Sequence, residues 1–296
     1  MIRDYLKSLP LLSPAVKAAR QARRQLFLRS EGEAQLQRAF ERIHGRPVDV
    51  EYPTLHSERL MAWLIRLHRE SDRRFSRLAD KLASRDYARD RLGPQYLTEI
   101  YWEGTDPHEV PFDDLPERYV IKPTHSSGQV ILADPELDRA EAIEEMSFWL
   151  QHNYYWAARE YQYLHIPPRL MVEECIDDGT EGGPFDYSFW CFNGTPKLSQ
   201  LRKYPRVVNQ FYDLDWNLLP LKARRNIPEV DLSRPPLFEE MVEVAARLAE
   251  GIEFVRVDLF SPPGKILFSE LTFTPAAARS LYHPPEWEEK LGQMWE

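Results

Sequence analysis

The chain has 296 residues, 43% of them hydrophobic, and a formal net charge of −9. This length and composition exclude a disordered or fibrous protein and leave room for two modest domains. The negative charge argues against nucleic acid as the main partner.

Residues 1–95 predict a helical N-terminal part. Ser13 and Pro14 suit the N-cap and first turn of a helix, and the arginine-rich stretch 14–29 follows. A basic helix of this kind is a candidate for weak peripheral contact with an anionic membrane face. We favour the simpler interpretation of a solvated helix or one that packs on the rest of the protein. The stretch 76–93 predicts a further helix that continues to its glycine.

The cysteines and the hydropathy both favour the cytoplasm. Cys175 and Cys191 lie in separate β-like runs without a CxxC neighbour, so we expect reduced core residues. No stretch approaches the roughly 18 apolar residues of a membrane span, and no signal-peptide stretch is evident. We therefore expect a cytoplasmic protein.

After Pro94 the pattern changes to short strands, hairpins and two helices. The expected strands and hairpins cover 119–132, 169–176, 187–201, 210–221 and 254–271, and the expected helices cover 136–155 and 236–250. Because these elements mix without a regular βαβ alternation, the sequence favours an α+β fold.

The first of these hairpins places a lysine at the end of a strand. Residues 119–132 read YVIKPTHSSGQVIL, so Lys122 closes one β-like run and the small polar loop THSSG follows it. This stretch is either an ordinary hairpin with a solvated tip or a mobile flap that holds phosphates.

The last hairpin carries charged side chains on one face. Arg256 and Asp258 alternate onto the same face of one strand, and Glu270 and Thr272 share a face of the next. If the paired residue numbers sum to an even number, Asp258 lies opposite or diagonal to Glu270. Such carboxylates either bind Mg²⁺, which takes oxygen ligands, or form salt bridges with Arg256.

The order of these features resembles the ATP-grasp superfamily. The matching stretches, in chain order, are DKLAS at 80–84, KPTHSSG at 122–128, VEECI at 172–176, Asp186, RVD at 256–258 and ELTFTP at 270–275. The longer strings LADK, NYYWAAREYQY and FYDLDWN resemble more narrowly the TupA-like ATP-grasp proteins, which are named for teichuronopeptide biosynthesis.

This resemblance implies an ATP-grasp fold in which two α+β lobes sandwich ATP. The implied domains are a helical N-terminal extension (1–75), a lobe with the phosphate loop (76–175) and a lobe with the metal site (176–296). The residues implied to bind ATP are Lys81, Lys122, Ser126, Ser127, Gly128, Glu173, Glu174, Ile176 and Asp186. Those implied to bind Mg²⁺ are Asp258, Glu270 and Thr272, and the catalytic residues are Arg256 and Arg279.

The implied reaction is ATP-dependent ligation of a carboxylate to an amine through an acyl phosphate. The TupA-like resemblance suggests a uronic acid of a cell-surface polysaccharide, or of its precursor, as the carboxylate. An amino acid or another amine would be the second substrate. Arg279 is the preferred candidate for recognising the carboxylate, and Arg202 is a weaker one.

Two alternatives stay open. Thr272 stands where many ATP-grasp enzymes have a metal-binding asparagine, and three alanines after Pro275 replace commoner glycines. These departures leave room for a binding protein with a degenerate ATP-grasp site. Asp213-Leu214-Asp215 also fits the D-x-D motif of glycosyltransferases that use nucleotide sugars.

Overall fold

The computed structural model describes residues 32–180, 183–203, 208–223 and 227–296. By its contacts the chain divides into two units, residues 1–48 and 49–296. In the first unit, helix α3 (Gly32–His44) stacks the rings of Phe40 and His44 at 4.1 Å between centroids. The basic helix expected over 14–29 lies outside the described residues.

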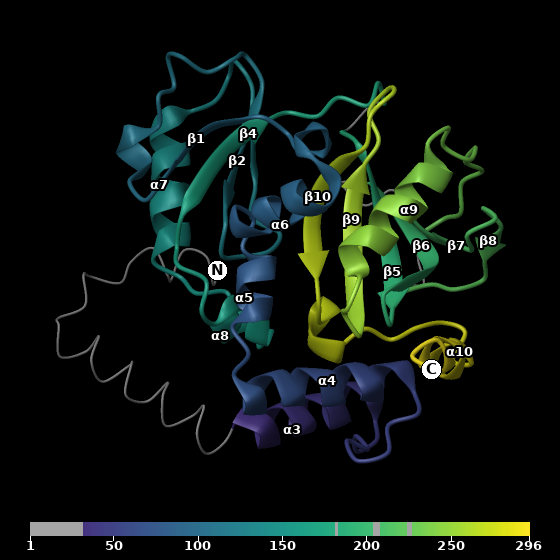
Figure 1. The fold of residues 1–296 in the computed structure, drawn as a ribbon. Coiled ribbons are helices and arrows are strands. Elements are labelled where there is room, and N and C mark those ends of the chain that lie inside the picture. The colour runs from purple at the N-terminus through teal and green to yellow at the C-terminus, as the bar shows by residue number, and fades with distance from the viewer. Residues whose placement is uncertain (1–31, 181–182, 204–207, 224–226) are drawn as a thin grey trace, which may run out of the picture. The chain divides into compact units, whose positions relative to one another are not determined.

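The second unit contains two antiparallel sheets (Figure 1). The four-stranded sheet has the order β1 (Ile100–Gly104), β4 (Leu170–Glu174), β2 (Tyr119–Pro123) and β3 (Ile131–Ala133). The six-stranded sheet has the order β10 (Leu267–Thr272), β9 (Phe254–Phe260), β5 (Phe185–Phe192), β6 (Thr195–Lys203), β7 (Val208–Tyr212) and β8 (Leu218–Leu219). Antiparallel sheets with packed helices confirm the α+β class.

Helices cover these sheets and connect them. The α-helices of this unit are α4 (His56–Glu70), α5 (Arg74–Ala79), α6 (Ala83–Leu92), α7 (Arg139–Leu150), α8 (Tyr155–Ala158), α9 (Phe238–Ala249) and α10 (Trp287–Gln293). The short 3₁₀ segments are η1 (Pro94–Tyr96), η2 (Pro107–Glu109), η3 (Tyr161–Tyr163) and η4 (Pro275–Ala278). No helix in the described part of the chain is long and apolar enough to cross a membrane.

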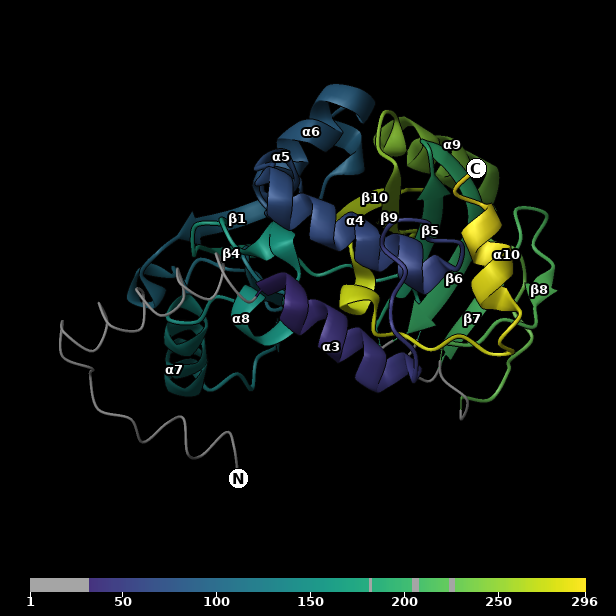
Figure 2. The same cartoon turned by 90° about the horizontal axis from the view of Figure 1, so that it is seen from below.

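Each sheet has its own core. Met146 and Trp149 of α7 pack against Ile121 and Val172 of the four-stranded sheet. Helix α9 packs against β5, β6 and β9 of the six-stranded sheet, and α4 packs against α10 and η4 (Figure 2). Burial of these apolar faces is the main force that holds each layer together.

Two predicted helices are interrupted. The helix expected over 76–93 breaks at Asp80, whose φ of −69° and ψ of 119° are extended, so that α5 ends and α6 begins at Ala83. The helix expected over 136–155 stops at α7, because the Asn153 side chain accepts a hydrogen bond from the Tyr155 amide and starts the separate turn α8. A side chain that bonds its own backbone competes with helix continuation.

Candidate active site

The break between α5 and α6 positions Lys81. The Asp80 carboxylate accepts a hydrogen bond from the Leu82 amide at 3.0 Å and pairs with Arg169 at 3.1 Å. The Lys81 amide bonds the Thr124 carbonyl, and its Nζ donates to the Ser126 carbonyl at 2.8 Å. This lysine is therefore held against the loop after β2 and does not project from a helix into solvent.

Lys122 lies near the end of β2 and pairs with a neighbouring strand. Its Nζ donates to Glu173 Oε1 at 2.5 Å, and Thr98 Oγ1 donates to the second oxygen of Glu173 at 2.7 Å. Burial raises the pKa of Glu173, but the charges of Lys122 and Arg85 and the bonds from Lys122 and Thr98 outweigh it and lower the pKa. Glu173 is thus a buried, ionised partner of the lysine.

The loop after Lys122 is only partly a solvated tip. Thr124, His125 and Ser126 are buried, and His125 Nε2 lies 3.0 Å from the Trp149 carbonyl oxygen. Only at Gly128, with φ of 73°, does the loop become exposed. The sequence suggested a loose loop from its first residue, but its first three residues pack inward because backbone and core contacts hold them.

The two carboxylates of the last hairpin face each other, in the even register on which their predicted pairing depended. Glu270 lies directly opposite Asp258 in the register of β9 and β10, and Thr272 lies opposite Arg256. Arg256 donates to both oxygens of Asp258, at 2.7 and 2.5 Å, and lies 3.6 Å from Glu270 Oε1. The salt bridges expected as one of the two interpretations are therefore present.

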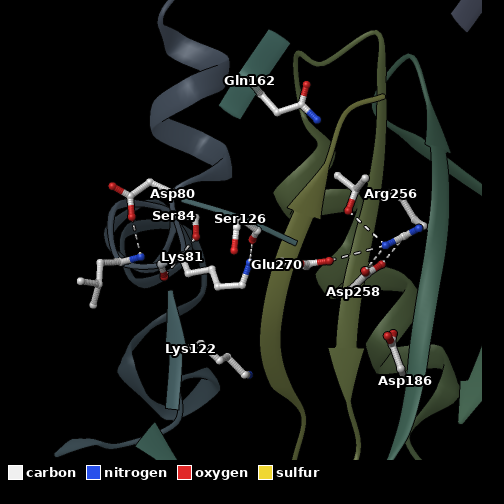
Figure 3. A network of polar contacts seen from close by, with 12 residues as sticks. Asp80, Lys81, Ser84, Lys122, Ser126, Gln162, Asp186, Arg256, Asp258 and Glu270 are labelled. Atoms are coloured by element: carbon white, nitrogen blue, oxygen red, sulfur yellow. Dashed lines mark hydrogen bonds and ion pairs between the residues drawn. The ribbon is translucent and has the colours of Figure 1, made fainter. Parts of the chain in front are cut away.

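The two halves of the site meet at Glu270. Its Oε2 atom lies 3.3 Å from Lys81 Nζ (Figure 3). Burial raises the pKa of Glu270, but the charges of Lys81, Arg256 and Arg202 outweigh it and lower the pKa to about 2. The carboxylate is therefore ionised at neutral pH beside a lysine that comes from the opposite side of the site.

Asp186 on β5 belongs to the same charged face of the six-stranded sheet, which also carries Arg202, Arg256, Asp258 and Glu270. Arg202 of β6 donates to Asp186 at 2.6 Å and also to Asp258 at 2.9 Å. Burial and the nearby Asp258 raise the pKa of Asp186 to about 6, although the charge of Arg202 opposes the shift. Arg202 thus links two carboxylates that the family resemblance assigned to different ligands, Asp186 to ATP and Asp258 to Mg²⁺.

Three predicted residues lie apart from this network in their contacts. The Glu174 carboxylate accepts a bond from the Glu99 amide at 3.3 Å, and Ile176 follows the end of β4. Arg279 is exposed, and its Nε donates to the Ala276 carbonyl at 2.9 Å. Their proposed contacts with ligands remain predictions.

A buried polar cluster beside the charged face was missed. It contains Glu160 and Gln162, from the REYQY string, and Thr274, from ELTFTP. Both sequence stretches had already been noted for their family resemblance, but the sequence does not show that these side chains are buried together. That information depends on long-range packing.

The donor chemistry fits part of a magnesium site. Mg²⁺ is commonly bound by one or two carboxylates together with substrate phosphates, and Asp258 and Glu270 supply two facing carboxylates. The Thr272 hydroxyl accepts a bond from Arg256 at 3.1 Å, which engages one of its lone pairs. Within the residues described, no group of three or more His, Cys, Asp or Glu side chains could hold a metal by itself. The pair therefore fits a metal whose remaining ligands come from phosphate and water.

Comparisons with known proteins fit this arrangement. The family model described as TupA-like ATPgrasp matches residues 59–296. A comparison with curated proteins finds no match.

The similar solved structures share little sequence identity with this chain. The D-alanine–D-alanine ligase from Bacillus anthracis complexed with ATP is 16% identical, with a TM-score of 0.41 over 69% of this chain and 56% of that chain. A second structure of the Bacillus anthracis ligase covers 73% of this chain and 65% of its own, at 18% identity and a TM-score of 0.43. The ATP-grasp ligase PsnB complexed with minimal precursor, Mg and ADP is 12% identical, with a TM-score of 0.40 over 80% of this chain and 67% of that chain. The chain thus spans less than two thirds of the length of the two Bacillus anthracis structures.

The family model covers most of the chain, including both sheets and every residue of the charged face. It agrees with the resemblance carried by LADK, NYYWAAREYQY and FYDLDWN in the sequence. The chain belongs to the TupA-like ATP-grasp family.

Proposed function

We propose that this protein is an ATP-dependent carboxylate–amine ligase that acts through an acyl phosphate. The observation that carries the proposal is the contact between Lys81 Nζ and Glu270 Oε2 at 3.3 Å. It joins a lysine of the expected phosphate site to a carboxylate of the expected metal site. A γ-phosphate with its metal ion needs both kinds of group at one place.

The residues around this contact have separate roles in the proposal. Lys81 and Lys122 neutralise phosphate charge, and the loop at 126–128 covers the phosphates and excludes water. Asp258 and Glu270, with Thr272, hold Mg²⁺, which offsets charge on the phosphates when bound. Arg256 stabilises the charge that develops on the transferred phosphoryl group.

The nucleoside end of the ligand is assigned to the strand ends farther from this contact. We assign the segment from Glu173 through Glu174 to Ile176 to adenine and Asp186 to the ribose. Asp186 suits a hydroxyl partner because its partly exposed carboxylate already bonds Arg202 and can accept a further bond.

We propose a uronic acid of a cell-surface polysaccharide, or of its precursor, as the carboxylate substrate, and an amino acid or another amine as the second substrate. Arg279 suits recognition of the carboxylate because its guanidinium is exposed and, within the described part of the chain, donates a single hydrogen bond, from Nε. The reaction is assigned to the cytoplasm.

The glycosyltransferase alternative loses its main support. Asp213 accepts bonds from the amides of Asp215 and Asn217 and from the Asn217 side chain. A carboxylate that closes its own turn in this way has a structural reason to be there.

Nucleotide binding is the first test. Isothermal titration with a non-hydrolysable ATP analogue and Mg²⁺ should show that Lys81→Ala and Lys122→Ala each lose roughly 1.5–3 kcal/mol, because each removes a charge-assisted phosphate contact. Lys265→Ala, in the exposed turn between β9 and β10, is the matched control and should bind as the wild type does. Unchanged affinity in both site variants would remove the lysine assignment.

Product analysis is the second test. The wild type should release ADP and phosphate when given a uronic acid and an amine, and Arg279→Ala should need more uronic acid for the same rate. Stimulation by free amino acid carboxylates alone would reject the uronic acid assignment. A protein that neither binds nor turns over ATP would be a degenerate member of the family.

A further inference from the structure

Glu160 is a buried carboxylic acid that the proposed chemistry has not used. It lies between α8 and η3 and is 5% exposed. Its Oε2 atom accepts a bond from Gln162 Nε2 at 3.0 Å and lies 3.4 Å from Thr274 Oγ1. The single hydroxyl proton of Thr274 serves Gln162 Oε1 at the shorter distance of 2.9 Å. One oxygen of Glu160 is therefore held by a single good bond.

Among the residues that the structure describes, the other oxygen of Glu160 has no hydrogen-bond partner. Within the described residues, no lysine or arginine forms an ion pair with Glu160 and no donor bonds its Oε1 atom. Burial raises the pKa of Glu160 to about 8, and the charges of Arg279 and Arg256 only partly oppose this. A buried carboxyl without a cation is costly, and such groups occur at functional sites.

The surroundings of Glu160 suit a cationic ligand. The rings of Tyr154 and Tyr163 pack edge to face at 4.9 Å between centroids. Burial raises the pKa of Tyr163, and the charges of Glu270 and Glu160 raise it further. The charged and titratable groups that face Glu160 are Arg279, Arg256, Glu270, Tyr154 and Tyr163. Aromatic faces beside a carboxylate are a common environment for ammonium groups.

The cluster lies at one end of the network: in Figure 3, Gln162 is drawn on the opposite side of the Lys81–Glu270 contact from Lys122 and Asp186. Burial raises the pKa of Tyr154 and Tyr163, and Ser127 of the loop is among the groups that oppose the shift of each.

We propose that Glu160, held by Gln162 and Thr274, binds the ammonium group of the amine substrate through its free oxygen. This assignment rests on the proposed ligase function and names the residue that recognises its amine. The ligand is a primary amine, of which an amino acid is one case.

The same carboxylate can accept the proton that the amine must lose. The ammonium gives one proton to Glu160, and the nitrogen lone pair forms the C–N bond at the acyl carbon. The bond from that carbon to the phosphate oxygen breaks, and its electron pair leaves with phosphate. The second nitrogen proton goes to the departing phosphate, which leaves as hydrogen phosphate.

Steady-state kinetics with a panel of glycine, L-glutamate, L-lysine and ethanolamine tests the assignment. Glu160→Gln should raise the KM for the best amine at least about tenfold, because it removes a charge-assisted bond. Titration with the ATP analogue should give the wild-type affinity for nucleotide. Glu58→Gln, a buried acid that caps the start of α4, is the control and should leave the amine KM unchanged. An unchanged amine KM in Glu160→Gln overturns the inference.

Proton release on binding provides a readout that needs no turnover. The best amine is titrated into protein that holds Mg²⁺ and the ATP analogue, in buffers of different ionisation enthalpy. The wild type should release protons on binding, up to one per site and fewer as the pH rises, since the ammonium ionises Glu160. Glu160→Gln should release none. Amine binding without proton release overturns the inference, whereas a wild type that never uses ATP contradicts the proposed function instead.

Discussion

At the scale of single residues, the two facing carboxylates of the last hairpin have different environments. The side chain of Asp258 is 1% exposed and bonds both Arg256 and Arg202. The side chain of Glu270 is 24% exposed, and its contacts with Lys81 and Arg256 are longer, at 3.3 and 3.6 Å. Asp258 therefore has a structural role in addition to any metal role, and Glu270 is the freer ligand.

This difference predicts separate outcomes for two isosteric variants. Asp258→Asn should lower the free energy of unfolding by roughly 3 kcal/mol or more, because it leaves Arg256 without its buried counter-charge. Glu270→Gln should change stability by less than about 1 kcal/mol yet abolish magnesium-dependent ADP release. Urea unfolding and an ADP assay on both variants check this, and equal losses of stability would contradict it.

The alternation of side chains along a strand predicts which of Arg256, Asp258, Glu270 and Thr272 share a face of their own strand. The register that places Glu270 opposite Asp258 depends on an irregularity between Phe268 and Glu270, where the pairing shifts by one residue. Arg202 comes from a strand far earlier in the chain, and its bond to Asp258 depends on the neighbours of β5 in the sheet. No local pattern contains that information.

At the scale of elements, the turn after β10 is strained. Ala276, Ala277 and Ala278 have φ values of 52°, 50° and 57°. This left-handed region costs an L-residue roughly 1–2 kcal/mol. The turn leads to Arg279, whose Nε bonds the Ala276 carbonyl, so the strained backbone positions the arginine.

Ala276→Gly should stabilise the protein by about 0.5–1 kcal/mol. Ala276 is exposed, so its methyl loses little packing, and glycine adopts positive φ at little cost. Ala157→Gly, at an exposed position of α8, is the control and should destabilise by about 0.5–1 kcal/mol. The urea concentration at the midpoint of unfolding measures both effects. A destabilised Ala276→Gly variant would contradict the assignment of backbone strain to this turn.

The first residue of α4 predicts a pH dependence of stability. His56 is fully buried among aromatic rings, Trp295 Nε1 donates to its Nδ1 at 3.1 Å, and burial lowers its pKa to about 3. Below the unfolded value near 6.5, the unfolded chain binds a proton that the folded chain rejects.

The contribution of His56 is therefore complete above pH 6.5 and lost as pH falls toward 3, with a slope of up to about 1.36 kcal/mol per pH unit. His56→Gln, which still offers Trp295 an acceptor, should flatten this part of the curve. Denaturant unfolding at several pH values measures the slope. Parallel curves for the variant and the wild type would contradict the assignment.

At the scale of the whole molecule, the sequence predicted the order of elements better than their arrangement. The strand pairs expected at 119–132 and 254–271 are present. The break at Asp80 could not be predicted from helix spacing, because the partner that stabilises it, Arg169, is distant in sequence. Glu160 lay in a string that resembled the family, but its burial depends on Thr274 from another part of the chain.

Four cations of the site each already contact a carboxylate. The pairs are Lys122 with Glu173, Lys81 with Glu270, Arg256 with Asp258 and Arg202 with Asp186. An approaching nucleotide therefore meets little net positive potential, on a chain whose net charge is −9, and electrostatic steering should be absent. The association rate, followed by stopped-flow fluorescence, should change less than about twofold between roughly 50 and 300 mM salt.

Glu173→Gln would leave Lys122 unneutralised and should make association faster and sensitive to salt. A steep salt dependence in the wild type would contradict the pairing. The close pairing of cations and carboxylates also sets which form of the nucleotide can bind. A free tetra-anion adds uncompensated charge to a balanced site, whereas the metal-complexed nucleotide adds much less. The site would therefore select the magnesium complex of the nucleotide when the two first meet, before any chemical step.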